Sequence, residues 1–122
     1  MSDNRLPNAQ RAIIDPAKTT GYLLNADHPD GGSKAVFFIQ HGFSPARPEE
    51  LIAALLAHAM TADVVTSANT VHGTKYVLRG MLQARDGRTP WVQAIWIVNA
   101  GQDTPRFVTA YPARRGTADE RT

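Results

Sequence analysis

The stretch Trp91-Val-Gln-Ala-Ile-Trp-Ile-Val98 decides the fold. In an extended strand successive side chains point to opposite faces, and here both faces are rich in apolar groups. A strand that is apolar on both sides is typical of the interior of a sheet, so we expect a neighbouring strand on each of its edges. One face carries Trp91, Ile95 and Ile97, and the other carries Val92, Ala94, Trp96 and Val98.

The flanking sequence supplies these neighbours. Residues 74–82 alternate as a strand, and Asp86-Gly87 is a hairpin turn signal between that segment and Trp91. After a turn over residues 99–105, residues 106–111 predict the last strand, which Pro112 ends. Residues 64–66 predict a short edge strand. We therefore expect a three- or four-stranded antiparallel meander in the second half of the chain.

The first half predicts helices. Asp15-Pro16 is a helix start, because aspartate caps free N–H groups and proline suits the first helical position, and residues 22–24 would form the buried face. A second helix is expected from a cap at Ser33 to residue 41, with Gly42 as its terminator. The third begins at Pro48 and continues to about residue 60. Its apolar stripe is formed by Leu51, Ile52, Leu55, Leu56 and Ala59.

The apolar stripe of this helix must be buried against another element, and in so short a chain the sheet is the candidate. The sequence therefore predicts an α+β fold, with N-terminal helices packed on a C-terminal antiparallel meander. The 122 residues suffice for one hydrophobic core, which we place in a single domain over residues 7–112. Residues 1–6 and 113–122 are polar and aperiodic, and we expect flexible termini there.

Composition excludes several classes of protein. Cysteine is absent, which rules out disulfides and thiolate metal sites. No apolar run approaches the roughly 18 residues that cross a bilayer, and residues 1–8 lack the pattern of a signal peptide. We therefore expect a cytoplasmic protein with no membrane partner. The four histidines have no paired metal-ligand spacing, and phosphate-loop and serine-nucleophile motifs are absent, so neither a metal nor a cofactor is expected.

The predicted meander carries basic and hydroxyl side chains that suit RNA cleavage without a metal. Such cleavage needs a base for the 2′-hydroxyl proton, an acid for the leaving oxygen and cations for the developing charge. Alternation places Thr109 and Tyr111 on one face of the last strand and Arg106 on the other face. The alternative is that these are ordinary solvated or half-buried strand residues. The candidate catalytic set is Lys75, Thr109, Tyr111, His72 and His28.

The chain resembles a bacterial family of unknown function over about residues 6–112. The resemblance rests on His72-Gly-Thr-Lys-Tyr-Val77, Val92-Gln-Ala-Ile-Trp-Ile97 and Pro105-Arg-Phe-Val-Thr-Ala-Tyr-Pro112, together with residues 6–9 and 27–29. Helices followed by an antiparallel sheet are similar, more distantly, to the metal-independent ribonuclease toxins grouped around barnase, EndoU, colicin nucleases and RelE. That likeness implies RNA as substrate and a cognate antitoxin or immunity protein as partner.

Two hypotheses from different classes follow. The first is a small metal-independent ribonuclease toxin domain. The second is a non-catalytic interaction module, such as an antitoxin, immunity or accessory protein of a toxin-type locus. Binding of a small molecule or nucleotide by the loop around His28 is a third alternative. A cleft lined by the candidate catalytic set favours the first, and an exposed apolar patch favours the second.

Overall fold

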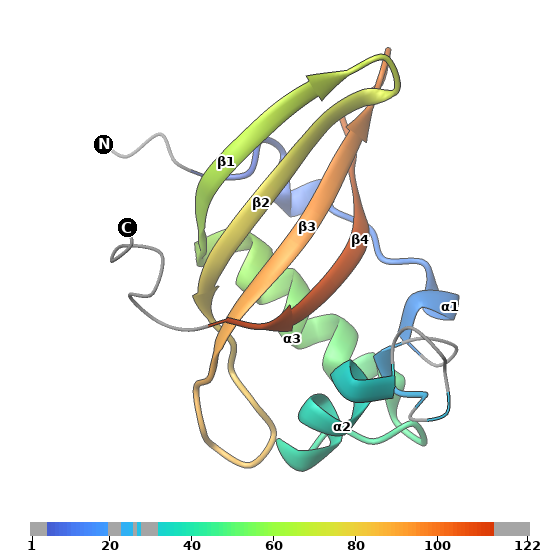
Figure 1. Ribbon diagram of the computed structural model, residues 1–122, viewed down its shortest axis with the longest axis vertical. Coiled ribbons are helices and arrows are strands. Elements are labelled where there is room, and N and C mark those ends of the chain that lie inside the picture. The colour runs from blue at the N-terminus through green and yellow to red at the C-terminus, as the bar shows by residue number, and fades with distance from the viewer. Residues whose placement is uncertain (1–4, 20–22, 26, 28–31, 114–122) are drawn as a thin grey trace.

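In the computed structural model, which describes residues 5–19, 23–25, 27 and 32–113, the helices precede the strands along the chain. A short 3-10 helix, η1 (Ala9–Arg11), and α1 (Pro16–Lys18) are followed by α2 (Gly32–Gln40) and α3 (Pro48–Thr61). The strands are β1 (Asp63–Thr70), β2 (Gly73–Met81), β3 (Trp91–Asn99) and β4 (Pro105–Pro112). The predicted α+β arrangement is confirmed (Figure 1).

The strands form one antiparallel sheet in the order β1-β2-β3-β4. β3 lies between β2 and β4, pairing from Trp91 to Asn99 on one side and from Val92 to Val98 on the other. The interior position predicted for this strand is therefore confirmed, and the meander has four strands.

β1 is longer than the strand predicted over residues 64–66. Ser67 to Thr70 pair with residues 73–76 of β2, and a two-residue turn joins the strands. These β1 residues are exposed and show no apolar alternation, so their local sequence carries no strand signal. Pairing with β2 extends the strand, because strand formation depends on neighbours more than on intrinsic preference.

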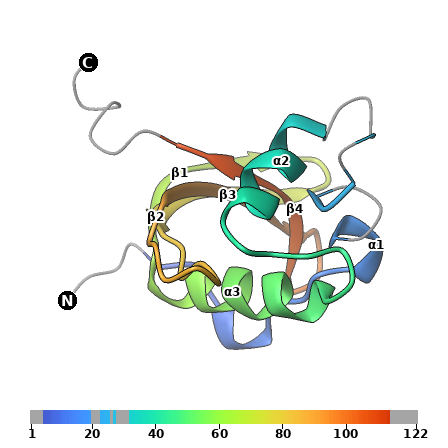
Figure 2. The same ribbon diagram turned by 90° about the horizontal axis from the view of Figure 1, so that it is seen from below.

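α3 covers one face of the sheet, as its apolar stripe predicts (Figure 2). Leu51, Leu55 and Ala59 are fully buried, while Ile52 and Leu56 are partly exposed. We call the sheet face toward α3 the core face and the opposite one the outer face. The core face buries Leu78, Val92, Ala94, Trp96, Phe107 and Ala110 in the same cluster.

The start of the first predicted helix is confirmed. The Asp15 carboxylate accepts a hydrogen bond from the Ala17 N–H at 3.0 Å, and the Thr19 hydroxyl donates to the Pro16 carbonyl at 2.8 Å. Leu23 and Leu24 are buried, as expected, whereas Tyr22 lies outside the described residues.

The second predicted helix begins slightly earlier than expected. α2 starts at Gly32, so Ser33 is its second residue, whereas the sequence placed Ser33 before the helix. Its end agrees with the sequence: Gly42 has a φ of 94°, and its N–H donates to the Ile39 carbonyl. A residue with that φ after a helix is usually glycine, because other side chains strain there.

The two edges of the sheet differ. β4 is joined by a parallel bridge in which the Ile13 N–H donates to Pro105 and the Ile13 carbonyl accepts from Phe107, both at 3.0 Å. Along the free side of β1, no segment within the described ranges pairs with the strand. At its start, Arg5 forms an ion pair with Asp63 at 2.5 Å. β1 is therefore the open edge of the sheet.

Candidate functional site

The outer face of the sheet combines cations, hydroxyl groups and an apolar strip. Val77, Ile95 and Ile97 form the strip and are only partly exposed. α3 does not cover this face, and polar groups surround the strip. They are Lys75 and Arg79 on β2, Gln93 on β3, and Arg106, Thr109 and Tyr111 on β4.

A bulge in β4 determines which residues share this face. Arg106 pairs with Ile97, but Thr109 pairs with Ile95, so β4 uses one residue more than β3 between these two pairs. Residues paired directly across strands point to the same face. Arg106 and Thr109 therefore both lie on the outer face. The prediction that they point to opposite faces is wrong, because it assumed uninterrupted alternation.

Three outer-face side chains form a chain of hydrogen bonds across β2, β3 and β4. Arg79 Nε donates to Gln93 Oε1 at 2.5 Å, and Gln93 Nε2 donates to the Tyr111 hydroxyl oxygen. Arg79 is directly opposite Gln93, and Gln93 is directly opposite Tyr111. Because the phenol oxygen accepts from Gln93, the Tyr111 O–H proton remains for donation to another group.

α2 adds a cation to the same place. Lys34 Nζ lies 3.5 Å from Thr109 Oγ1 and 5.6 Å from the centroid of the Tyr111 ring, within the range of a cation–π contact. Figure 2 shows α2 beside β4, on the side of the sheet away from α3. We call this connected group of five the polar row: Lys34, Arg79, Gln93, Thr109 and Tyr111.

The structure brings together part of the predicted catalytic set. Lys75, Thr109 and Tyr111 lie on the outer face, but Lys75 is opposite Arg106 across Ile97. Arg79, four residues further along β2 on the same face, is the cation in line with Tyr111. Their catalytic roles remain predictions.

The two histidines of the set are placed differently. His72 is exposed in the β1–β2 turn, where its N–H donates to Thr70 Oγ1 at 3.1 Å and its carbonyl accepts from Ala100 at 2.9 Å. That turn is at the opposite end of β2 from Arg79. His28 lies outside the described residues.

Sequence reasoning missed Lys34, Arg79 and Gln93. One signal was available for Gln93, which is a polar residue within an otherwise apolar strand. Lys34 had no such signal, since its position depends on how α2 packs against β4. Long-range packing of this kind cannot be read from local patterns.

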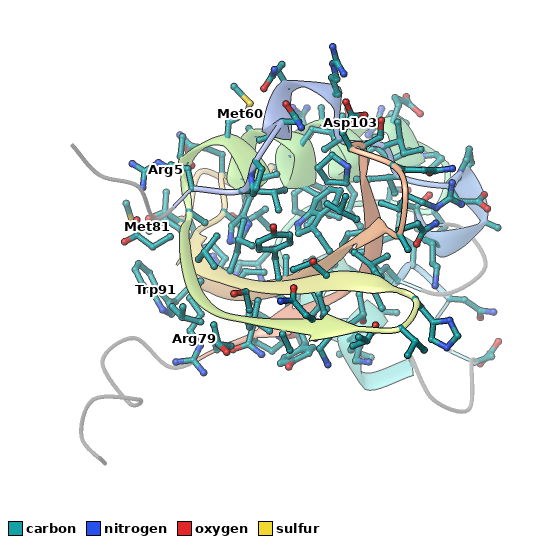
Figure 3. The ribbon with its side chains drawn as sticks, turned by 90° about the horizontal axis from the view of Figure 1, so that it is seen from above. Arg5, Met60, Arg79, Met81, Trp91 and Asp103 are labelled. Atoms are coloured by element: carbon teal, nitrogen blue, oxygen red, sulfur yellow. The ribbon has the colours of Figure 1, made fainter. Side chains whose placement is uncertain are left out.

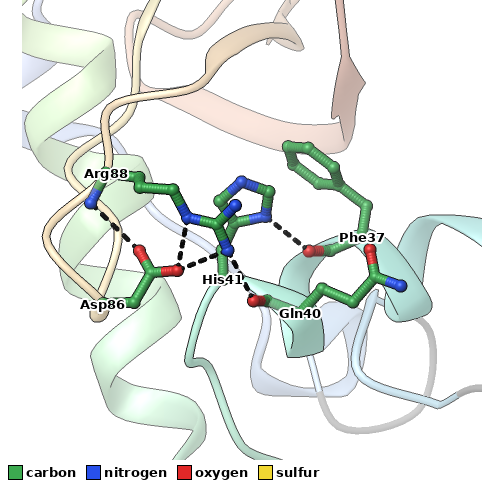
Figure 4. Close-up of polar contacts among 5 residues, drawn as sticks. All are labelled: Phe37, Gln40, His41, Asp86 and Arg88. Atoms are coloured by element: carbon green, nitrogen blue, oxygen red, sulfur yellow. Dashed lines mark hydrogen bonds and ion pairs between the residues drawn. The ribbon is translucent and has the colours of Figure 1, made fainter.

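A second polar cluster fastens the end of α2 to the β2–β3 loop (Figure 4). Arg88 contacts Asp86 Oδ2 through Nε and Nη2 at 2.7 and 2.6 Å, and Nη2 donates to the Gln40 carbonyl at 2.9 Å. His41 Nδ1 lies 2.9 Å from the Phe37 carbonyl. Hydrogen bonds from Arg88 hold the pKa of Asp86 below its usual range. We assign this cluster a structural role, because it joins two segments far apart in sequence.

His58 of α3 is buried in the core. Its Nε2 lies 2.9 Å from the Val92 carbonyl, which makes Nε2–H the donor and links the helix to β3. Burial lowers the pKa of His58, while the carbonyls of Val92 and Gly80 act in the opposite direction. The lowered pKa favours the neutral imidazole, and His58 packs as a core residue.

Neither metal ligands nor membrane spans emerge from the described ranges. Within them, no three residues among His, Cys, Asp and Glu gather as a metal site. Nor does any helix there combine the length and apolar character needed to cross a bilayer.

The fold and the polar row define a small α+β domain with a connected row of polar side chains on the outer face of its sheet. The chain belongs to the family named Domain of unknown function (DUF6883), whose model matches residues 5–114. No match was found among curated proteins.

The fold is similar to that of a solved structure. It is a chain of the contact-dependent growth inhibition toxin–immunity protein complex from Klebsiella pneumoniae 342. The TM-score is 0.66 at 14% sequence identity, and the match covers 84% of this chain and 100% of that chain. Identity this low shows the fold alone, and it does not say whether this chain plays the part of toxin or of immunity protein.

Proposed function

We propose that this domain is a metal-independent ribonuclease of the toxin type, and that it cleaves RNA on the outer face of its sheet. The observation that carries the proposal is the polar row. It connects two cations, Lys34 and Arg79, with the hydroxyl groups of Thr109 and Tyr111 through one set of contacts. Its five members include no carboxylate that would repel a phosphate.

The chemistry required is transesterification. The 2′-oxygen attacks the adjacent phosphorus and loses its proton to a base, while the bond to the 5′-oxygen breaks and that oxygen gains a proton. Lys34 and Arg79 would stabilise the charge on the phosphorane oxygens. Tyr111, held by Gln93, would donate the proton to the leaving oxygen. His28 stays the sequence-based candidate for the base, and Lys75 stays the candidate for a further phosphate contact. His72, the other histidine of the predicted set, is in the turn at the opposite end of β2 from Arg79, so we do not assign it the base in this step.

The structural neighbour supports the toxin-type setting. That structure is a complex of a toxin with an immunity protein, and it covers most of this chain at a TM-score of 0.66. We therefore propose a cognate antitoxin or immunity protein as partner. Because the substrate is RNA, we place the action of the domain in the cytoplasm.

The test is RNA degradation by purified protein in the presence of a chelator. Tyr111→Phe removes the proton donor and is expected to slow cleavage about 10²- to 10⁴-fold, the usual contribution of a general acid. Tyr76→Phe is the matched control, because Tyr76 packs against the core cluster on the opposite face. Loss of cleavage on adding chelator, or full activity of Tyr111→Phe, would contradict the proposal.

Lys75→Ala tests the sequence-based candidate separately. Lys75 is exposed on β2, so its removal should leave thermal stability nearly unchanged. Loss of cleavage with an unchanged melting temperature would establish a catalytic contribution. Wild-type cleavage by this variant would exclude a contribution of Lys75 to phosphate binding.

The second candidate function, a non-catalytic interaction module, is favoured by a different region. β1 is an open edge strand that carries the exposed Val65, and Met60, in the last turn of α3 just before β1, is exposed as well. Open edges of this kind accept strands from partner proteins. Expression in bacteria separates the two functions. A toxin arrests growth and is rescued by its neighbouring gene product, whereas an immunity protein or antitoxin is harmless alone.

A further inference from the structure

A pocket of about 420 Å³ opens where β1, β2 and β3 meet the end of α3. Met81 and Trp91 are directly opposite each other in the β2–β3 register and form its apolar side. Met81 is 51% exposed, and Trp91 is only partly buried. Figure 3 shows Met81, Trp91 and Arg79 together along one side of the molecule. This volume lies within the range of small-molecule sites, roughly 300–1,000 Å³.

The pocket is also lined by charged residues of both signs and by a residue with an amide side chain. Asp63, Arg79 and Gln83 are among its lining residues, together with the small residues Ala62 and Gly80. Asp63 is balanced by its ion pair with Arg5. An indole beside a thioether, with donors and acceptors around them, suits a flat aromatic ring that has polar edges.

The position of the pocket relative to the polar row restricts the class of ligand further. Arg79 belongs to both: it lines the pocket and donates to Gln93, which in turn donates to Tyr111. A chain of side chains therefore leads directly from the pocket to the proposed proton donor. A ligand with a flat polar ring at one end and a phosphate a short distance away would contact both.

We propose that this pocket is a nucleobase subsite, in which an unpaired base of single-stranded RNA stacks on Trp91 and is held at its edge by Asp63, Arg79 or Gln83. The inference rests on the proposed ribonuclease function and specifies its substrate class. A base must be free of its pairing partner to enter a side-chain pocket, and stacking on aromatic side chains is how single strands are usually bound.

The two tryptophans give a direct test. Trp96 is fully buried, so quenching of tryptophan fluorescence by a bound base reports Trp91. The probe is a single-stranded 2′-O-methyl RNA of mixed sequence, which cannot be cleaved through its 2′-position, compared with the same strand in a duplex. We expect saturable quenching by the single strand and little by the duplex. Quenching by neither, or equally by both, would overturn the subsite.

Variants then locate the binding. Anisotropy of a labelled single strand should show about 5- to 100-fold weaker binding for Trp91→Ala, as expected for loss of one stacked base. Met81→Ala should also weaken binding, whereas Met60→Ala should not. Met60 is a matched control, because it is 50% exposed and does not line the pocket. If Trp91→Ala fails to fold, Gln83→Ala and Met81→Ala carry the same test, since both positions are exposed.

The outcomes also separate this inference from the proposed function. Binding that requires Trp91 without any cleavage of unmodified RNA would retain the subsite and refute the ribonuclease. Cleavage with unchanged affinity in all three pocket variants would retain the ribonuclease and refute the subsite.

Discussion

Gly80→Ala is expected to destabilise the fold through one crowded contact. A Cβ atom at Gly80 would lie 2.7 Å from Ala62 Cβ and 3.0 Å from Ala62 Cα. Carbon atoms pack best at about 3.5–4.0 Å, so the new methyl group overlaps its neighbour by about 1 Å. Both residues are buried, and Ala62 follows directly after α3. Relief would therefore require a shift between the helix end and β2.

The magnitude follows from this overlap. Overpacking a buried site costs about 1–3 kcal/mol. For a chain of this length, each kcal/mol lowers the melting temperature by about 4 °C. Circular dichroism during thermal and urea denaturation should therefore show a melting temperature about 4–12 °C below that of the wild type. The slope of the urea transition should not change, since the surface area that unfolding exposes stays nearly the same.

A double-variant cycle separates crowding from the other effects of adding a methyl group. Ala62→Gly removes the atom nearest to the new Cβ, so the pair should be more stable than the sum of the two single changes by about 0.5–3 kcal/mol. A glycine with free space around it behaves differently, because replacing it by alanine raises stability by about 0.4–1 kcal/mol. A higher melting temperature for Gly80→Ala, or strict additivity with Ala62→Gly, would refute the crowding.

Two further predictions concern the core. Leu55→Ala should cost about 2–5 kcal/mol in urea denaturation, because Leu55 is fully buried between α3 and the sheet; a cost below about 1 kcal/mol would contradict this packing. Stability should fall as the pH drops below about 6.5, because the unfolded chain then binds a proton that buried His58, with its lowered pKa, does not. His58→Gln keeps an N–H donor for Val92 and should flatten the decline between pH 7 and 5; an equally steep decline would exclude His58 as its source.

The elements that were predictable carry their signals locally. β3 is apolar on both faces, and α3 combines Pro48 at its start with a stripe containing Leu51 and Leu55. These side chains are apolar and must be buried, so the spacing of the apolar residues is sufficient to predict the helix and the strand. The far half of β1 is the opposite case. Ser67 to Thr70 are exposed, and pairing with β2 alone makes them a strand.

The candidate site was predictable only in part. Thr109 and Tyr111 could be placed on one face because they are two residues apart on a strand. Lys34 lies far from them in sequence and reaches Thr109 through the packing of α2 beside β4. The register of the strands places Arg79, and not Lys75, in the same row as Gln93 and Tyr111. This register depends on both connections between the strands and on the bulge in β4, so it could not be predicted from one strand alone.

The bulge in β4 is the feature on which the polar row depends. From the Arg106–Ile97 pair, uninterrupted pairing would place Thr109 opposite Ala94 and Tyr111 opposite Val92, which are both buried core positions. A slip of one residue moves every following side chain to the other face. The extra residue therefore sends Ala110 into the core and brings Thr109 and Tyr111 out beside Lys34 and Gln93. Strand bulges often serve to re-aim functional side chains, and here one bulge delivers both hydroxyl groups of the proposed site.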